Sequence, residues 1–288
     1  MSEALISVII PFYSGVDWLQ EAVESVMAQT YKNKEIIVIN DGSKESLLTF
    51  FQQYENDIVY VEQTNAGAAA ARNTGIEMSK GQYVAFLDSD DLWEPDKLTK
   101  QLAFMIESEL VWSHSSYTKF GDNIESELRD LSNFKGSIYP KCLSYNPIAT
   151  PTVVIKKTAL DEDNTLRFAV GMKSGEDSIF WLQLSKKFML GVIEEPLVKV
   201  RIRGNNAALR AYAQLRAKAQ IWDQLVSKNI IHKSEVKILV RGAFLYCCFA
   251  YKLLDTLLKS EKNEQKKSVE VLAKMLYLLP WLIFRSQR

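Results

Sequence analysis

One short stretch, residues 81–93, constrains the fold of this chain more than any other. Five mostly apolar, β-favouring residues, Tyr83 to Leu87, predict a strand that is buried on both faces. Three carboxylates, Asp88, Asp90 and Asp91, follow within four positions. Because unpaired carboxylates are costly to bury and repel one another, a cation at this strand end would be stabilising. Oxygen ligands without His or Cys favour Mg2+ or Mn2+ over zinc, although an acidic strand-to-helix turn explains the same residues.

The first hundred residues alternate between apolar strands and helices. Strands are predicted over residues 5–10, 35–39 and 58–61, and segments with helical periodicity follow them. Such alternation is typical of an α/β fold with a mostly parallel sheet flanked by helices, a Rossmann-like nucleotide-binding half. Ligands of such sheets bind at the carboxyl ends of the strands. No G-x-G-x-x-G follows the first strand and no Walker sequence is present, so dinucleotide-binding and P-loop classes lose their main support.

Four motifs stand at or just beyond the ends of predicted strands. They are Pro11-Phe12-Tyr13, Asp41-Gly42-Ser43, Gly67-x-x-x-Ala71-Arg72-Asn73 and Asp88-Ser89-Asp90-Asp91. Their order and spacing resemble the nucleotide-binding half of the family 2 inverting glycosyltransferases, which have the GT-A fold. The resemblance covers residues 5 to about 100.

The resemblance implies a nucleotide-sugar site. Pro11 and Tyr13 would wall the base of a nucleoside diphosphate sugar, and Asp41 would accept a hydrogen bond from a uracil-like edge. Arg72 would approach the base or the pyrophosphate, and Gly67 belongs to the same site. Each residue also has an ordinary explanation, as a strand stop, a turn or a surface ion pair. Four motifs in one order favour the site over four separate coincidences.

The same resemblance implies a metal and a diphosphate clamp. Asp88 would hold the ribose side, and Asp90, with Asp88 beside it, would bind Mn2+ or Mg2+ between the two phosphates. Such an ion neutralises charge on the leaving diphosphate. The last predicted strand, residues 196–203, ends in Arg203, where family members often have a histidine. An arginine can clamp a diphosphate, and this departure argues against a metal ligand at that position.

A second acidic motif, Gly175-Glu176-Asp177, opens an amphipathic helix that is rich in aromatic residues. Acidic residues suit a helix N-terminus through the macrodipole, which explains them without catalysis. The resemblance implies instead the family's catalytic-base motif, because an inverting transfer needs a carboxylate to take the proton of the acceptor hydroxyl. The implied base is Asp177, and Glu176 orients the acceptor or the base. For His114 a structural role is favoured over a metal or acid–base role.

Two domains are predicted. Residues 1–205 form a GT-A catalytic domain, with the nucleotide-sugar half in 1–100 and the acceptor and catalytic-base half in 101–205. Residues 206–288 form a helical C-terminal extension. A polar, poorly patterned stretch, residues 121–147, is expected to be a loop on the acceptor side.

The C-terminal extension is strongly basic, although the formal net charge of the chain is zero. Residues 201–288 carry 17 Lys and Arg against 6 Asp and Glu, whereas residues 1–200 carry 18 against 29. Basic residues around an apolar helix face favour an anionic membrane surface over nucleic acid, and packing on the protein's own core or in a homodimer is the alternative. Pro280 is expected to bend or end this helix. The apolar residues are Val271, Leu272, Met275, Leu276, Leu278, Leu279, Trp281 and Phe284, and the basic ones are Lys266, Lys267, Lys274, Arg285 and Arg288.

Cysteine usage and hydropathy predict a cytoplasmic location. Cys142, Cys247 and Cys248 offer no disulfide framework, since two of them are adjacent. The N-terminus lacks the basic segment of a secretory signal, and no stretch offers the roughly 18 uncharged apolar residues that a spanning helix needs. If the tail binds lipid, the protein is peripheral on the inner face of the cell membrane.

Together these features predict a metal-dependent inverting glycosyltransferase of the hexosyl- or N-acetylhexosaminyltransferase class. It would move a sugar from a nucleoside diphosphate sugar, with UDP weakly favoured, to a hydroxyl of a glycan or lipid-linked acceptor in cell-surface polysaccharide or glycolipid synthesis. One alternative is a sugar-nucleotide nucleotidyltransferase, which usually opens with a Gly-rich basic loop that is absent here. The other is a non-catalytic sugar-nucleotide-binding scaffold, against which Asp90 and Asp177 argue.

Overall fold

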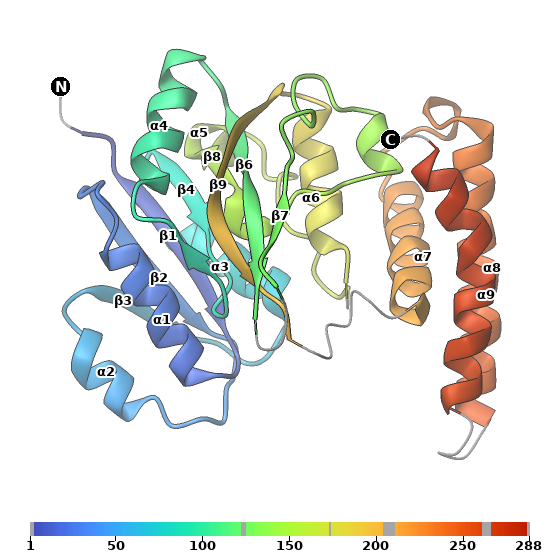
Figure 1. The fold of residues 1–288 in the computed structure, drawn as a ribbon, viewed down its shortest axis with the longest axis horizontal. Coiled ribbons are helices and arrows are strands. Elements are labelled where there is room, and N and C mark those ends of the chain that lie inside the picture. Colours follow the sequence, from blue (N-terminus) through green and yellow to red (C-terminus); the bar gives the residue numbers. More distant parts are fainter. Residues whose placement is uncertain (1–2, 122–124, 173, 204–210, 261–265, 287–288) are drawn as a thin grey trace. The chain divides into compact units, whose positions relative to one another are not determined.

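The computed structural model divides into two compact units (Figure 1). The structure describes residues 3–121, 125–172, 174–203, 211–260 and 266–286. The first unit comprises Met1–Ile138, Pro147–Gly171 and Lys187–Arg203, and the second comprises Tyr139–Asn146, Met172–Lys186 and Gly204–Arg288. The predicted domain limits at residues 100 and 205 stay predictions.

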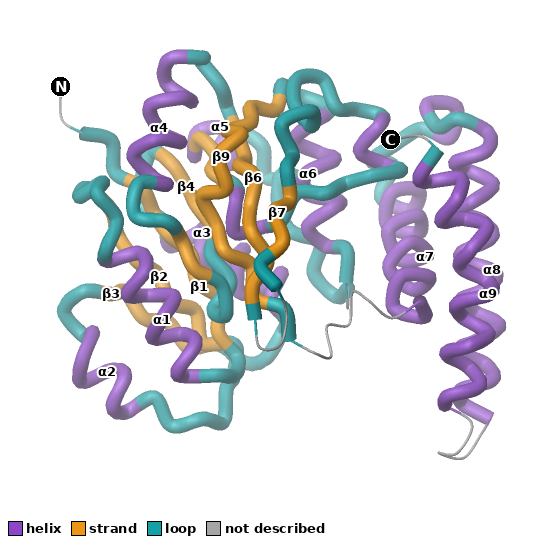
Figure 2. The backbone as a smooth tube through the Cα atoms, in the orientation of Figure 1, coloured by secondary structure: helices purple, strands orange, loops and turns teal. Residues whose placement is uncertain are grey.

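A mixed β-sheet forms the centre of the first unit (Figures 1 and 2). Its order is β3-β2-β1-β4-β8-β6-β9-β5, and β7 pairs with β6. Strands β3, β2, β1 and β4 are parallel, as predicted, whereas β8 runs antiparallel to both β4 and β6 and makes the other half mixed. The described strands are β1 (Ile6–Phe12), β2 (Lys34–Asn40), β3 (Ile58–Glu62), β4 (Tyr83–Phe86), β5 (Leu92–Trp93), β6 (Trp112–Phe120), β7 (Glu127–Arg129), β8 (Val154–Lys156) and β9 (Leu190–Arg201).

Helices cover both faces of the parallel half of the sheet. On one face, apolar residues of α1, α2 and α4 form a single core with alternate residues of β1 and β2. On the other face, Ile37 and Ile39 of β2 pack against Ala71 of α3. Strands buried on both sides explain the continuous apolar runs in the sequence. The helices of this unit are α1 (Val16–Met27), α2 (Leu48–Tyr54), α3 (Ala68–Met78), α4 (Lys97–Glu107) and α5 (Lys157–Glu162), with a 3-10 turn η2 (Thr150–Thr152).

The sequence predicts that Pro11 stops the first strand, and this prediction is wrong, because β1 continues to Phe12. Pro11 follows Ile9, the last residue of β1 that is paired with β4, and its register partner on the β2 side is Ile39. Phe12 turns its carbonyl toward β2, where the amide of Asp41 donates to it at 2.8 Å. Pro11 therefore faces the side on which β4 has already ended, and its missing N–H removes no ladder hydrogen bond.

The second unit is helical. Its core includes the stacked rings of Trp222 and Phe244, 5.2 Å apart, and Phe284 packs edge-on against Phe244 at 4.9 Å. Helix α9 continues past Pro280 to Arg285, with Phe284 buried in the turn that follows, so this proline does not end the helix, and a bend there stays a prediction. Among the described helices, none is long and apolar enough to cross a membrane. The elements are η1 (Lys141–Leu143), α6 (Glu176–Ser185), α7 (Ala211–Ser227), η4 (Lys233–Glu235), α8 (Ile238–Ser260) and α9 (Lys266–Arg285).

Candidate functional site

A pocket of about 330 Å³ opens in the first unit where β1, β2 and β4 end. The carboxyl ends of parallel strands meet at one edge of the sheet, so motifs far apart in the sequence converge there. Of the residues predicted for the nucleotide-sugar and metal sites, those that line this pocket are Pro11, Tyr13, Asp41, Arg72, Asp88, Asp90 and Arg203.

Two ion pairs organise the charge of the pocket. Arg72 of α3 is buried and donates from Nη2 to Asp88 Oδ1 at 2.6 Å. Arg203 donates from Nε to Asp90 Oδ2 at 2.7 Å, and its Nη2 contacts the same oxygen. The guanidinium of Arg72 also lies over the ring of Phe168, 5.2 Å from its centre. Asp88 and Asp90 are thus each matched by an arginine from another segment.

The three acidic residues after β4 have different surroundings. Burial raises the pKa of Asp90, the Asp88 carboxylate raises it further, and Arg203 opposes the shift. Asp91 is buried and accepts a hydrogen bond from the backbone amide of Arg201 at 2.7 Å. Burial, followed by the charges of Asp88 and Asp90, raises the pKa of Asp91 well above its usual range. Asp91 therefore fixes the turn, whereas Asp88 and Asp90 line the pocket.

Two residues that the sequence did not single out support this turn. Arg201 donates from Nε to the carbonyl of Asp90 at 2.9 Å and forms an ion pair with Glu21. Trp18 of α1 lies under two guanidinium groups, 5.6 Å from that of Arg201 and 4.9 Å from that of Arg203. The sequence did contain a signal for Arg201. It stands two positions before Arg203 at the end of an apolar strand, and residues two apart in a strand lie on the same side.

Asp41 holds the loop that precedes α3. The backbone amides of Ala66 and Gly67 donate to its two carboxylate oxygens at 2.8 Å, and Gln63 Nε2 donates at 2.7 Å. Gly67 has φ +88 and ψ +161, a backbone region that is open almost only to glycine, and its role in binding the nucleotide sugar stays a prediction. The contact of Asp41 with a base stays a prediction, and a carboxylate retains lone pairs for it.

The donor set of the pocket fits a hard divalent ion. Among the described residues, no three His, Cys, Asp or Glu side chains gather into a complete cage for a metal. Asp88 and Asp90 are close enough for the charge of one to shift the pKa of the other. Mg2+ is commonly held by one or two carboxylates, with the substrate phosphates and water as further ligands. The pocket meets that requirement, and metal binding stays a prediction.

Glu176 and Asp177 occupy the first turn of α6, in the second unit. Both are partly exposed, and Asp177 Oδ1 accepts a hydrogen bond from the amide of Ser178 at 2.6 Å. Gly175 precedes them with φ +87, and a Cβ there would lie 2.8 Å from Ile221 Cδ1 of α7. Glycine is therefore required for the helix to begin here. The structure assigns these acids and the pocket to different units, so their predicted joint action stays a prediction.

His114 is a structural histidine on the evidence of its surroundings. It is fully buried in β6, and Nε2 lies 2.8 Å from the carbonyl of Phe134. Burial lowers its pKa to about 4, so the ring is neutral at pH 7. A neutral ring with Nε2 as donor satisfies the Phe134 carbonyl.

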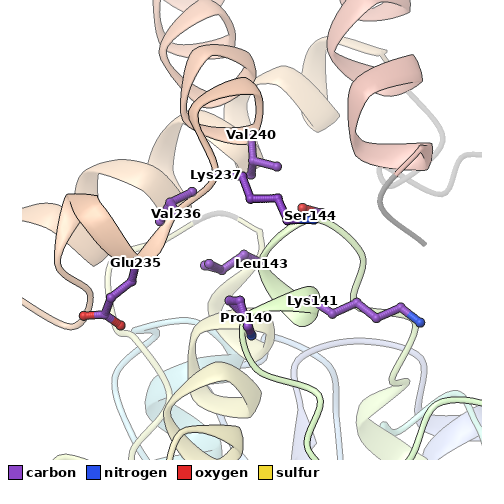
Figure 3. A pocket seen from close by; sticks show the side chains of 8 residues that line it. All are labelled: Pro140, Lys141, Leu143, Ser144, Glu235, Val236, Lys237 and Val240. Carbon is purple, nitrogen blue, oxygen red and sulfur yellow. The ribbon is translucent and has the colours of Figure 1, made fainter.

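A second pocket, of about 340 Å³, lies within the helical unit (Figure 3). Leu143, Val236 and Val240 give it an apolar lining, and the side chain of Lys141 extends away from them. Glu235 is engaged by the Tyr139 hydroxyl, which, with other donors, lowers the pKa of Glu235 to about 2. The two pockets have similar volumes, but the pocket at the ends of β1, β2 and β4 gathers more charged side chains. We therefore assign the functional site to that pocket.

Comparison with known proteins decides the family. The family model described as Glycosyl transferase family 2 matches residues 7–161. The chain belongs to glycosyl transferase family 2. The matched residues include the pocket motifs from Pro11 to Asp90, whereas Glu176, Asp177 and Arg203 lie beyond them.

Similar proteins include uncharacterised glycosyltransferases and one whose name states its reaction. An uncharacterised glycosyltransferase of Rickettsia bellii is 43% identical over 211 residues, which are 72% of this chain and 30% of the relative. The UDP-Glc:alpha-D-GlcNAc-diphosphoundecaprenol beta-1,3-glucosyltransferase WfaP of Escherichia coli is 33% identical over 185 residues, 64% of this chain and 71% of that protein. The chain spans about a third of the length of the first rickettsial relatives that it matches.

A solved structure supports the predicted GT-A fold of this family 2 chain. The structure of S. aureus TarS 1-349 in complex with UDP-GlcNAc is similar, with a TM-score of 0.62 at 17% identity. The similarity covers 96% of this chain and 81% of the TarS chain. The fold class predicted from the sequence is confirmed, including the helical C-terminal part.

Proposed function

We propose that the protein transfers a sugar from a nucleoside diphosphate sugar to an acceptor hydroxyl, with inversion at the anomeric carbon. The observation that carries this proposal is the pocket at the ends of β1, β2 and β4. There the ion pairs Arg72–Asp88 and Arg203–Asp90 lie together with Asp41, in a chain of family 2. These charges suit a ligand that combines a diphosphate with a divalent cation, because the arginines can contact the diphosphate and the carboxylates can bind the cation.

The donor binds in this proposal through an exchange of ion-pair partners. Arg203 is the more accessible arginine, with 45% of its side chain exposed, against 7% for Arg72. An arginine fork matches the geometry of phosphate oxygens, so Arg203 turns from Asp90 to the diphosphate when the donor enters. Arg72 stays on Asp88 and keeps that carboxylate oriented. Tyr13, which is 53% exposed, supplies an aromatic wall for the base.

A divalent cation completes the site. Asp88 and Asp90 would hold Mn2+ or Mg2+, which would supply charge neutralisation for the leaving diphosphate. Within the protein, Asp91 and Arg201 keep the backbone of the turn fixed, so that both carboxylates are presented without reorganisation.

Asp177 is the general base of this proposal. It takes the proton of the acceptor hydroxyl while the hydroxyl oxygen bonds to the anomeric carbon and the bond to the diphosphate breaks. A single displacement inverts the anomeric centre. Glu176 orients the acceptor or the base, and both acids stand in the first turn of α6.

We infer UDP as the nucleotide and a lipid-linked glycan as the acceptor. TarS has been solved with UDP-GlcNAc, and the name of WfaP specifies UDP-Glc and a diphosphoundecaprenol-linked acceptor. The transferred sugar is then a hexose or an N-acetylhexosamine, and the product belongs to a surface polysaccharide or glycolipid. A nucleotidyltransferase is disfavoured, because Tyr13, Ser14 and Gly15 after β1 include no basic residue.

A donor screen tests this proposal. The protein is incubated with UDP-, GDP- and TDP-linked sugars and Mn2+, and release of the nucleoside diphosphate is measured. We expect release from UDP-sugars, and NMR of the product should show the opposite anomeric configuration to the donor. Release of pyrophosphate from a nucleoside triphosphate and sugar phosphate would support the nucleotidyltransferase instead. Binding of UDP-sugar without any turnover would support the scaffold, and retention would exclude single displacement.

A further inference from the structure

Helix α8 presents apolar side chains to solvent, and three of them form a stripe along the helix. Ile238, Leu245 and Phe249 are exposed, Ile238 by 81% and Phe249 by 66%. Their spacing of seven and then four residues places them on one side of the helix. Arg241 and Lys252, both exposed, follow Ile238 by three and fourteen positions and therefore share one edge of the stripe.

Helix α9 repeats this pattern with the same spacing. Val271, Leu278 and Leu282 are at least half exposed and follow one another by seven and four residues. Lys274 and Arg285, also exposed, follow Val271 by three and fourteen positions. Two helices that differ in sequence thus carry the same apolar stripe with two basic residues on the same edge.

The charged side chains described beside the stripes are mostly basic. Among the described side chains of residues 238–258 and 271–285, one is acidic, that of Asp255. It accepts a hydrogen bond from the Tyr212 hydroxyl at 3.2 Å. The exposed charges of these two segments are therefore basic. Long basic side chains can keep their heads in a polar layer while their stems follow an apolar surface.

We propose that α8 and α9 attach the protein peripherally to a lipid bilayer that contains anionic headgroups. The apolar stripes enter the boundary between headgroups and acyl chains, and the basic edges contact the phosphates, as in interfacial amphipathic helices. The proposal concerns where the protein works rather than its reaction, so it goes beyond the proposed transfer and does not depend on it.

A second copy of the chain fits this surface less well than lipid. A symmetric dimer would place the same patch of both copies face to face, and the basic edges would repel each other. One residue of the surface predicted from the sequence does not belong to it, because Phe284 is buried against Phe244. The side chains of Lys266 and Lys267, and residue Arg288, lie outside the described part of the chain.

Vesicle flotation of the full chain tests the proposal. Vesicles of phosphatidylcholine with phosphatidylglycerol are compared with phosphatidylcholine alone, at low and high salt. We expect flotation with the anionic vesicles and release at high salt. Leu245→Ser with Phe249→Ser, Leu278→Ser with Leu282→Ser, and a third variant with Gln at Arg241, Lys252, Lys274 and Arg285 should each lower the bound fraction about tenfold or more.

The matched control is Ile106→Ser with Met189→Ser, which removes two exposed apolar residues from the first unit. It should leave flotation unchanged, and all variants should bind UDP as the unaltered chain does. No flotation of the unaltered chain overturns the proposal, and so does an equal loss in the control. If the stripe variants instead turn an oligomer into a monomer while flotation is unchanged, a second copy covers the stripes.

Discussion

The pocket of the first unit and the stripes of the second unit use charged residues in opposite ways. In the pocket, Arg72 and Arg203 are each fixed by a carboxylate from another segment. On α8 and α9, the basic side chains of the stripes are exposed, and Arg285 lies over the ring of Trp281 at 4.9 Å. Binding of a small charged ligand needs a preorganised site, whereas attachment to a lipid surface needs only an amphipathic helix. Single substitutions should therefore have large and specific effects at the site, and small and additive effects on the stripes.

The largest expected effect comes from Asp177→Asn, which tests whether the second unit contributes a catalytic residue or is only accessory. The amide keeps the size of the side chain but cannot accept the proton, so the transfer rate should fall by about two to four orders of magnitude. The affinity for the donor should barely change, because the base acts on the acceptor. Near-normal transfer by this variant, measured with a radiolabelled donor, would move the role to Glu176 or elsewhere.

Arg203→Met sharpens the contrast between fixed and exposed charges. We expect the affinity for UDP, measured by calorimetry, to fall about tenfold or more, since a charge-assisted phosphate contact is lost and Asp90 loses its partner. Arg203→Lys should restore part of the affinity. The matched control is Lys100→Met, which breaks exposed ion pairs with Asp96 and Glu195 and should change nothing measurable. Equal effects in Arg203 and Lys100 variants would contradict the assignment.

The parallel half of the fold and the first pocket motifs could be predicted from the sequence. Strands buried on both faces leave apolar runs, and side chains that follow such strands must meet at one edge of the sheet. Asp41, Asp88 and Asp90 were found in this way, and the structure brings them to one pocket.

Contacts between distant segments could not be predicted. Asp90 forms an ion pair with Arg203, which lies 113 positions later in the sequence. Asp41 accepts hydrogen bonds from Gln63 and from the amide of Gly67, which belong to the loop before α3. The end of β1 was misplaced at Pro11 for the same reason, and α9 continues past Pro280. Whether a proline interrupts an element depends on where its neighbours end and what they pack against, which local sequence does not contain.

A smaller effect, on stability, is expected from one lysine in each unit. Lys97 of α4 is fully buried, donates to Gln101 at 2.8 Å and lies over the ring of Trp93, and burial lowers its pKa to about 7. Between pH 7 and about 10 the unfolded chain holds a proton that the folded chain lacks, so the free energy of unfolding should rise with pH. Lys218 of α7, partly buried with a pKa of about 8, should behave likewise but more weakly.

Lys97→Met tests this expectation. It should raise the free energy of unfolding at pH 7 by about 1 to 3 kcal/mol, since relief of the buried charge outweighs the lost hydrogen bond to Gln101. The difference from the unaltered chain should shrink by pH 9. Urea denaturation at both pH values gives the measurement. A variant that is less stable at pH 7, or one that keeps the full pH slope, would contradict this account of Lys97.

Titration of UDP tests the central proposal most directly, because that proposal is a joint site for a diphosphate and a divalent cation in the first unit. The full chain is titrated with UDP by calorimetry in the presence of Mn2+ and again with EDTA, and Asp90→Ala is treated in the same way. We predict tight binding by the unaltered chain with Mn2+, and at least about tenfold weaker binding in EDTA. For Asp90→Ala, addition of Mn2+ should bring no gain in affinity. Equal UDP affinity in Mn2+ and EDTA, or an undiminished gain from Mn2+ in Asp90→Ala, would contradict the proposed site.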